Sequence, residues 1–156
     1  MPGAITIRTA RHEDMPEMSE LLRILFSIEN DFSIDPEKQR RGLEAMLDGK
    51  SRTVFVAQIE TRVVGMCSGQ LNISTAEGAP SVLIEDVVVL EDWRGKGIGK
   101  ELIHAVRQWA EQNGATRMQL LADRNNSSAL KFYSRMGWER TNMVCLAQRI
   151  LPEERI

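Results

Sequence analysis

The stretch VVVLEDWRGKGIGKEL, residues 87–102, is the most informative part of the chain. Its opening valines, Val87, Val88 and Val89, are typical of the end of a buried strand. Glycines alternating with basic residues follow, and beyond Gly97 the apolar residues recur with the period of a helix. Because the first amides of a helix lack partners and its dipole adds partial positive charge, this junction predicts an anion site, for phosphate or pyrophosphate.

The loop between this strand and this helix combines backbone freedom with positive charge. Glycine lets the main chain approach a ligand closely, and lysine and arginine attract anions. We expect the anion to be bound by Arg94, Gly95, Lys96, Gly97, Ile98, Gly99 and Lys100. The alternative for an arbitrary loop of this pattern is a glycine turn with a solvated basic rim.

Two common nucleotide-binding loops are excluded by spacing. A P-loop requires a Ser or Thr after its lysine, and Glu101 follows Lys100 here. A dinucleotide fingerprint requires a glycine three positions after Gly97, where Lys100 stands. Nucleotide hydrolysis that depends on a P-loop therefore does not fit.

Size and charge limit the classes of function further. The chain has 156 residues, 42% of them hydrophobic, which is enough for one domain over residues 1–156. With a net charge of −2, the surface has no general attraction for nucleic acid or anionic membranes. No apolar run approaches the roughly 18 residues of a membrane span. We therefore expect neither nucleic acid nor a membrane among its partners.

Cysteine and histidine usage argues against a metal site. Cys67 and Cys145 stand 78 positions apart, and the two histidines, His12 and His104, complete no ligand spacing. The first residues alternate polar and apolar side chains and lack the apolar stretch of a secretory signal. We expect two reduced core cysteines in a cytoplasmic protein, with no metal.

The hydrophobic pattern along the chain predicts an α/β (α+β) fold without linkers or repeats. The expected order is β-α-α-β-β-β-α-β-α-β, a mixed sheet covered by helices on both faces. The expected strands are 4–9, 53–59, 62–73, 82–90, 116–121 and one or two within 138–148, and the expected helices are 14–26, 35–47, 97–112 and 127–136.

Two motifs together resemble the Gcn5-related N-acetyltransferase (GNAT) superfamily. Arg94, Gly97 and Gly99 match its Arg/Gln-x-x-Gly-x-Gly/Ala loop between a strand and a helix. The segment NSSALKFYSRMGW, residues 126–138, matches its second block, Asn-x-x-Ala-x-x-x-Tyr-x-x-x-Gly-Phe/Trp. The resemblance covers nearly the whole chain and implies a mostly antiparallel sheet that is splayed at its centre.

This resemblance implies acetyl-coenzyme A as the acetyl donor. The pantetheine arm would extend along the main chain of Val87, Val88 and Val89 like an added strand. The pyrophosphate would rest on the amides of residues 95–100, and Asn126 would hold the arm from the facing helix. A backbone N–H of Val88 or Val89 would stabilise the oxyanion.

The reaction also needs an acid and a base. Tyr133 is the general acid that the resemblance implies for the departing thiolate. An alkyl amine with a pKa near 10.4 is protonated at neutral pH, so a base must take its proton. Leu121 occupies the place where some relatives carry a glutamate.

Glu85, acting through water, is then the first candidate for the base, and Asp86 is the second. Neighbouring strand residues point to opposite faces, and regular alternation would put Glu85 on the face of Val87 and Val89. A cross-strand partner or a cation anchor is the alternative role for Glu85.

The sequence says least about the amine that accepts the acetyl group. Phe26, Glu29 and Asn30 begin an acidic, aromatic-flanked stretch that suits a small primary amine or an amino sugar, although a solvated loop is as good a description. A protein amine remains an alternative acceptor, and a non-catalytic acyl-coenzyme A sensor an alternative function. A homodimer, paired through residues 140–150, is a possible assembly.

Overall fold

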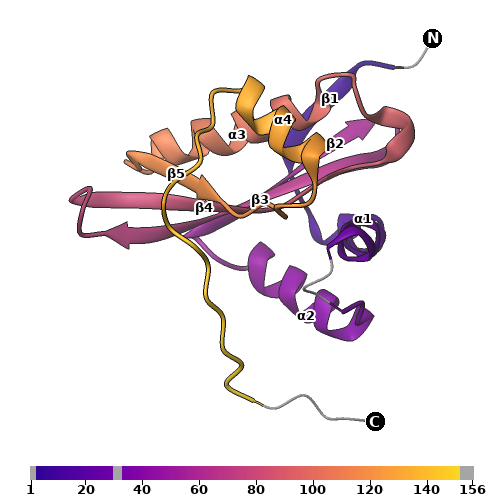
Figure 1. Cartoon of the computed structure of the whole chain (residues 1–156). Helices are drawn as coiled ribbons and strands as arrows, with labels where there is room; N and C mark the ends of the chain where they lie inside the picture. The colour runs from indigo at the N-terminus through magenta and orange to yellow at the C-terminus, as the bar shows by residue number, and fades with distance from the viewer. Residues whose placement is uncertain (1–2, 30–32, 152–156) are drawn as a thin grey trace. The chain divides into compact units, whose positions relative to one another are not determined.

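The computed structural model describes residues 3–29 and 33–151 and divides into two compact units. The first unit extends to Leu120 and the second begins at Leu121. The elements of both are labelled in Figure 1. Each unit is described by itself below, and the single domain expected over residues 1–156 stays a prediction.

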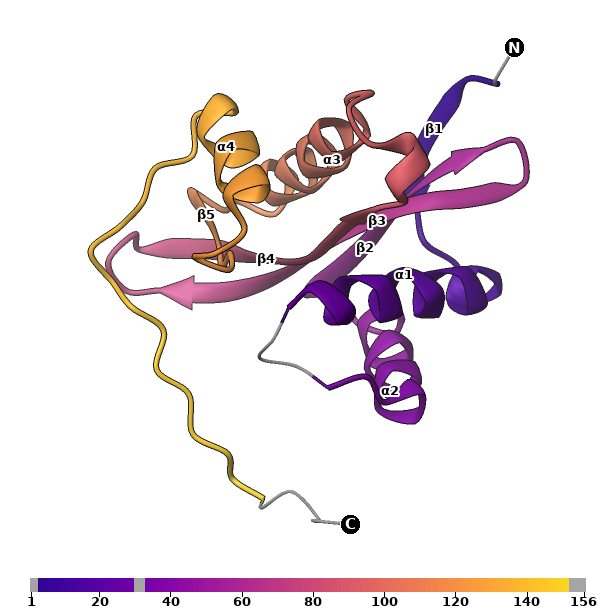
Figure 2. The same cartoon turned by 45° about the vertical axis from the view of Figure 1, so that its right-hand side comes forward.

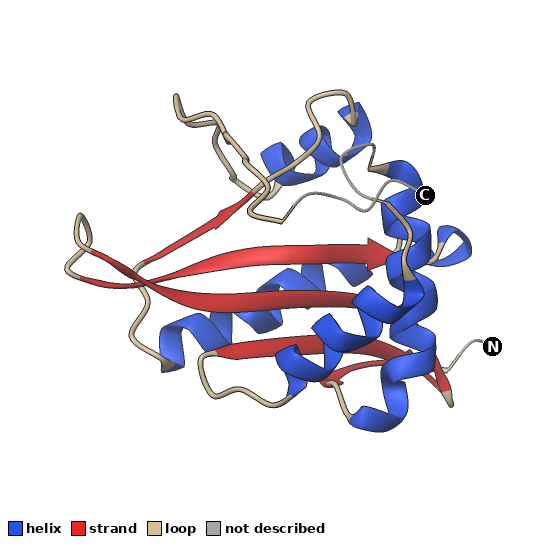
Figure 3. Cartoon of the chain, turned by 90° about the horizontal axis from the view of Figure 1, so that it is seen from below, coloured by secondary structure: helices blue, strands red, loops and turns tan. Residues whose placement is uncertain are grey.

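The first unit is built on a sheet of five strands in the order β1-β2-β3-β4-β5. Antiparallel pairings join β1 to β2, β2 to β3 and β3 to β4, and β5 pairs with β4 in parallel. The strands are seen from below in Figure 3. This confirms the mixed, mostly antiparallel sheet. The strands are β1 (Ile5–Thr9), β2 (Arg52–Ile59), β3 (Arg62–Ser74), β4 (Ala79–Val89) and β5 (Arg117–Leu120).

Helices cover both faces of this sheet. In Figures 1 and 2, α1 and α2 lie together on one face and α3 lies on the other. The three helices are α1 (Met15–Ile28), α2 (Pro36–Leu47) and α3 (Ile98–Gln112), and short 3-10 turns precede α1 (His12–Asp14) and follow β4 (Glu91–Trp93). The start of α2 agrees with its sequence signal, because Pro36 begins the helix and the Asp35 carboxylate accepts the Lys38 amide.

The two faces of the sheet pack differently. On the face of α1 and α2, apolar side chains form one buried cluster that includes Met18, Leu22, Met66 and Val88. On the other face, β3 lets α3 approach closely through a glycine. A Cβ added at Gly69 would stand 2.8 Å from a methyl group of Val106. Burial of these two faces is the main source of the unit's stability.

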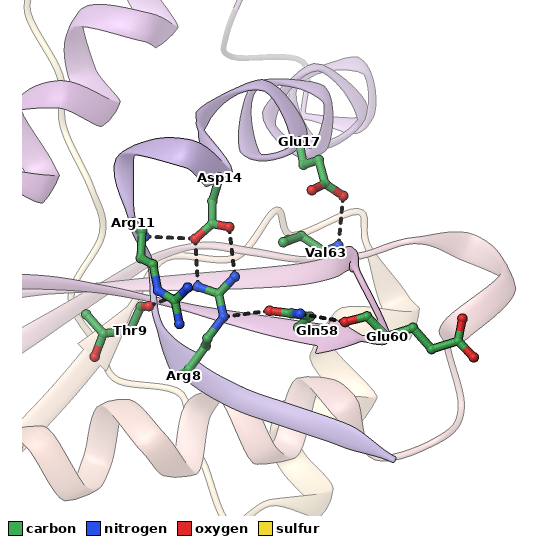
Figure 4. Close-up of polar contacts among 8 residues, drawn as sticks. All are labelled: Arg8, Thr9, Arg11, Asp14, Glu17, Gln58, Glu60 and Val63. Atoms are coloured by element: carbon green, nitrogen blue, oxygen red, sulfur yellow. Dashed lines mark hydrogen bonds and ion pairs between the residues drawn. The ribbon is translucent and has the colours of Figure 1, made fainter. Parts of the chain in front are cut away.

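A polar network fastens β1 to β2 and to the start of α1 (Figure 4). The Arg8 guanidinium donates to both oxygens of Asp14 at 2.8 Å, and its Nε donates to Gln58 at 2.7 Å. Asp14 is only 5% exposed and also accepts the Arg11 amide. The hydrogen bonds from Arg8 hold the pKa of Asp14 below its ordinary value. Both ends of this buried pair are satisfied, so it fixes where the helical layer begins.

The second unit contains one helix, α4 (Ser127–Arg135), among its described residues. The Asn126 side chain accepts the Ala129 amide at 3.1 Å and so caps the helix. Gly137 follows the helix with a φ of +89°, which is a left-handed conformation that suits glycine. The helix predicted over 127–136 is therefore confirmed, and Asn126 and Gly137 account for where it begins and ends.

The strand or strands expected within 138–148 were wrong. Residues 138–151 form no strand, and five large apolar side chains between residues 143 and 151 are 78–96% exposed. Alternation indicates that a segment can form a strand, but a strand also needs a partner for its main-chain groups. The described part of the second unit offers none, since its only regular element is α4. The exposed residues are Met143, Val144, Leu146, Ile150 and Leu151.

Candidate active site

The end of β4 has hydrogen-bonding groups on one side that no strand uses. Pairing with β5 stops at Ile84, whereas pairing with β3 continues to Val89. The Leu90 amide donates to the Val64 carbonyl of β3 at 2.8 Å. Because main-chain groups alternate along a strand, those of Val89 point away from β3. The splayed centre of the sheet is therefore present within the first unit, and Val89 presents its N–H at it.

A β-bulge interrupts β4 just before this open end. Met66 pairs with Val88 and Ser68 pairs with Glu85, so β4 has one residue more than β3 between the two pairs. Asp86, with a φ of +54°, adopts the left-handed conformation there. Asp and Asn accept this conformation more readily than other residues with side chains.

The bulge corrects the alternation assumed from the sequence. After it, Val88 packs in the cluster on the side of α1, and Val89 lies beside Gly65 and Leu102 on the side of α3. Before it, Val82 lies on the side of α3. Regular alternation would have put Val82 and Val88 on one face. Glu85 therefore does not share a face with Val89. The prediction that it does was wrong, because it assumed regular alternation through the bulge.

Asp86 is the most perturbed acid of this region. Burial, helped by the neighbouring charges of Glu85 and Glu29, raises the pKa of its carboxyl group to about 7. A hydrogen bond from Ser68 opposes the shift. Glu85, next to it, is exposed. A carboxyl group that titrates near neutral pH suits proton transfer, and the sequence ranked it second because a bulge leaves no pattern in the residue types.

Cys67 lies under the same bulge. Its thiol is fully buried, and burial together with the charge of Asp86 raises its pKa above the ordinary value. The thiol therefore stays protonated and is a poor nucleophile. This confirms the core position expected for Cys67, whereas the same expectation for Cys145 was wrong, because Cys145 lies exposed in the segment after α4.

The loop after β4 has the geometry expected of an anion cradle. Gly95 and Gly97 have φ values of +75° and +81°, so both need glycine. Gly97 is the N-cap residue of α3, and among the described residues no side chain caps this helix start. The Ile98 side chain is buried in the core, so only its main chain can serve a ligand.

Two of the basic side chains around this loop have internal contacts. Arg94 donates from Nε to the Val89 carbonyl at 2.9 Å, which ties the loop to the end of β4. The Lys96 ammonium lies 4.7 Å from the centre of the Trp93 ring, a cation–π contact that holds the lysine over the turn. Lys100 lies on the first turn of α3 and is exposed. The positive charge of the loop is thus held in place on one side of the helix start.

Two of the three residues proposed to bind the acceptor lie in the described part of the chain. Phe26 is half-buried and packs against the core on the side of α1. Glu29 ends α1, with its amide bonded to the Leu25 carbonyl, and its charge acts on Asp86. Asn30 lies outside the described residues. Within the first unit, Glu29, Glu85 and Asp86 therefore form an acidic group at the bulge.

The second unit carries the two remaining candidates on α4. The Tyr133 ring makes edge contacts with Phe132 and Trp138, with ring centres 5.1 and 6.1 Å apart. The Trp138 amide also donates to the Tyr133 carbonyl. Asn126 uses its carbonyl oxygen as the helix cap, so only its amide group remains to donate to a ligand.

Comparison with known proteins assigns the chain to a family. The sequence model of the acetyltransferase (GNAT) family matches residues 15–138, from the start of α1 through the second motif. The chain belongs to the GNAT family. Within this family, both motifs and the splayed β4 occupy their expected places in the chain order.

Several curated proteins are similar in sequence. An uncharacterized N-acetyltransferase of Methanocaldococcus jannaschii is 32% identical over 91 residues, which are 58% of this chain and 40% of that protein. An aminoglycoside N(6')-acetyltransferase type 1 of Salmonella typhimurium is 25% identical over 65% of this chain and 72% of its own length. The GNAT chain thus spans less than half of the first of these relatives.

Solved structures share the fold. The aminoglycoside N-acetyltransferase AAC(6')-Iy in complex with CoA has a TM-score of 0.84 at 19% identity, covering 97% of this chain and 98% of its own. The aminoglycoside acetyltransferase meta-AAC0020, from an uncultured soil metagenomic sample and in complex with sisomicin, has a TM-score of 0.74 at 28% identity, covering 95% and 97%. These likenesses agree with the fold found here.

The described residues contain neither a group of metal ligands nor a helix that could span a membrane. No group of three or more His, Cys, Asp or Glu side chains in the part of the chain that the structure covers is arranged to hold a metal ion. Among its described helices, none has the length and apolar character that a membrane span requires.

Proposed function

We propose that this protein is an N-acetyltransferase that moves the acetyl group of acetyl-coenzyme A to a primary amine by direct attack. The observation that carries the proposal is the continuous path from the open side of β4 into the amides that begin α3. A thioester arm can lie along residues 87–89 and hydrogen-bond to main-chain groups that point away from β3, such as the Val89 N–H, and its pyrophosphate can follow onto residues 95–100. Family membership of the chain supports the same donor.

The main chain of β4 would stabilise the oxyanion, and the acidic group at the bulge would supply the base. The Val89 N–H is our choice for the oxyanion, since it points away from β3. Asp86 is our choice for the base, in place of Glu85, because its pKa of about 7 lets it accept a proton at neutral pH. Tyr133 is proposed as the acid that protonates the thiolate, and Asn126 as a donor to the arm.

The acceptor we propose is a small polycationic amine, of the amino-sugar kind. The charges of two further carboxyl groups, on Glu29 and Glu85, act on Asp86 at the bulge. Such a group attracts several ammonium charges and repels anionic acceptors. Two of the relatives named above are aminoglycoside acetyltransferases, which supports the same class. A lysine or N-terminal amine of a protein is the alternative acceptor.

A donor titration followed by an amine panel tests this function. Calorimetry should show acetyl-coenzyme A binding with a dissociation constant of roughly 1–100 µM, and Gly97→Val should weaken it at least tenfold, since valine does not accept the left-handed conformation. A thiol-release assay should then detect turnover with diamines or amino sugars. Absence of donor binding would overturn the proposal. Donor binding without release for any amine would favour a sensor.

We also propose that the chain forms a homodimer through its last described segment. The apolar side chains of residues 143–151 are largely exposed, and such surfaces commonly mark contacts with a partner. Sedimentation equilibrium at micromolar concentration should show the dimer. A monomer throughout would contradict this assembly.

A further inference from the structure

A cavity of about 560 Å³ lies within the first unit, away from every residue assigned above to donor or acceptor. It is bounded by β1, β2, the turn before β2 and the flank of α3. Its volume is within the range of sites that hold small organic molecules. The residues that matter for its chemistry are Lys50, Arg52, Phe55, Glu101, His104 and Trp109.

The charged side chains of this cavity are mostly basic. Lys50 and Arg52 are cations at neutral pH, and His104 adds a third basic group, whereas Glu101 is the only acidic residue of the lining. Among the described residues, the side chains of Lys50, Arg52 and His104 form no ion pair and no hydrogen bond. An anion entering the cavity would therefore meet cations that have no carboxylate partner there.

Arg52 gives the strongest indication of a missing ligand. Its Nε atom is buried and has no hydrogen-bond partner in the described part of the chain. Four other arginines, Arg8, Arg23, Arg40 and Arg107, each pair with a carboxylate. Buried polar groups of native proteins nearly always have a partner, so an acceptor at Arg52 is the missing element.

The position of the Arg52 side chain is set by a glycine. The guanidinium group lies against Gly49, and a Cβ at that position would overlap it. Gly49 has no positive φ, so its backbone alone does not require glycine. The absent side chain at position 49 is what makes room for the guanidinium at the cavity wall. This provides a way to move Arg52 without removing it.

Two half-buried aromatic rings complete the lining. Phe55 comes from β2 and Trp109 from α3, on opposite walls. Rings of this kind accept flat apolar groups. We propose that this cavity binds a small aromatic carboxylate, with the carboxylate on Arg52 and Lys50 and the ring between Phe55 and Trp109. The site is independent of the proposed acetyl transfer.

NMR titration of the ¹⁵N-labelled full chain with benzoate tests the site. The Arg52 Nε–H and Trp109 indole signals should shift in a saturable manner, with a dissociation constant in the range of about 0.1–5 mM. Benzamide, which lacks the charge, and cyclohexanecarboxylate, which lacks the flat ring, should each bind at least fivefold more weakly. Inorganic phosphate tests charge alone and should also bind more weakly than benzoate.

Two variants and one matched control locate the anion. Arg52→Gln removes the guanidinium and Gly49→Ala displaces it, and each should weaken benzoate binding at least tenfold. Arg41→Gln removes the same charge from the exposed face of α2 and should change binding less than twofold. Thermal unfolding would confirm that each variant folds.

Three results would overturn the proposal. The first is the absence of shifts at Arg52 and Trp109 up to about 20 mM benzoate. The second is equal binding of benzamide, which would mean an apolar pocket without anion recognition. The third is an equal loss of binding in Arg41→Gln, which would mean a general effect of surface charge.

Discussion

Replacing Asp86 with asparagine is expected to lower kcat by about 10²–10⁴-fold, the usual contribution of a general base. Asparagine keeps the shape of the side chain and accepts the left-handed backbone at the bulge, but it cannot take the amine proton. Steady-state kinetics with the best amine from the panel would measure the loss. In the unmodified protein, kcat/KM should rise with pH through about 7, where the Asp86 carboxyl group titrates, and this limb should vanish in the variant.

Glu85→Gln is the matched control, because it removes a neighbouring carboxylate that is exposed. We expect less than a fivefold change in kcat and a slightly lower apparent pKa of the remaining limb, since the charge of Glu85 raises the pKa of Asp86. If instead Glu85→Gln removes the pH limb and Asp86→Asn keeps it, the base is Glu85.

Asp86→Asn should lower kcat but raise the stability of the folded chain above neutral pH. The folded chain raises the pKa of Asp86 from 3.8 to about 7, so between these values it binds more protons than the unfolded chain. Stability from this group is complete below pH 3.8 and is lost as pH rises through about 7. Asp86→Asn should therefore be more stable than the unmodified protein at pH 8, by about 4 kcal/mol, and equal to it near pH 3.5. Denaturant unfolding at the two pH values would separate a catalytic loss from a folding defect.

Replacing Tyr133 with phenylalanine is expected to lower kcat by about 10²-fold while leaving the affinity for acetyl-coenzyme A within threefold. The change deletes one hydroxyl group and keeps the ring that contacts Phe132 and Trp138. Protonation of the departing thiolate would then depend on water. Kinetics and donor calorimetry on the same preparation would measure the two quantities.

Trp138→Phe is a control for this prediction, because it alters the ring packing around Tyr133 and leaves the hydroxyl group in place. We expect a smaller loss of kcat and a measurable loss of stability. An unchanged turnover number in Tyr133→Phe would remove Tyr133 from the mechanism. An equal loss in both variants would assign it a packing role.

The sequence predicted most of the first unit because its signals are local. Pro36 after Asp35 marks a helix start, and the glycine-spaced loop after three valines marks the junction of β4 and α3. The left-handed φ values at Gly95 and Gly97 follow from the same glycines. Each of these features depends on residues within a few positions, so a single sequence is sufficient to find it.

The two errors have physical reasons of another kind. The bulge at Asp86 arises because β4 has one residue more than β3 between two paired positions, and no residue type in the sequence predicts it. The strand expected after Gly137 required a partner, which alternation of side chains cannot supply. The cavity at Arg52 was also missed, because its lining comes from positions as far apart as Phe55 and Trp109. All three depend on how distant segments meet.

The extra residue in β4 also restricts how this chain can change over evolution. Glu85 and Val88 lie on one face of the sheet although they are three positions apart, because β4 has one residue more than β3 between their partners Ser68 and Met66. A deletion of a single codon between Ile84 and Val88 would leave the pairs on both sides in place, but it would remove the bulge and with it the left-handed backbone that now positions Asp86. The sheet could therefore absorb a length change in this segment that the proposed site could not.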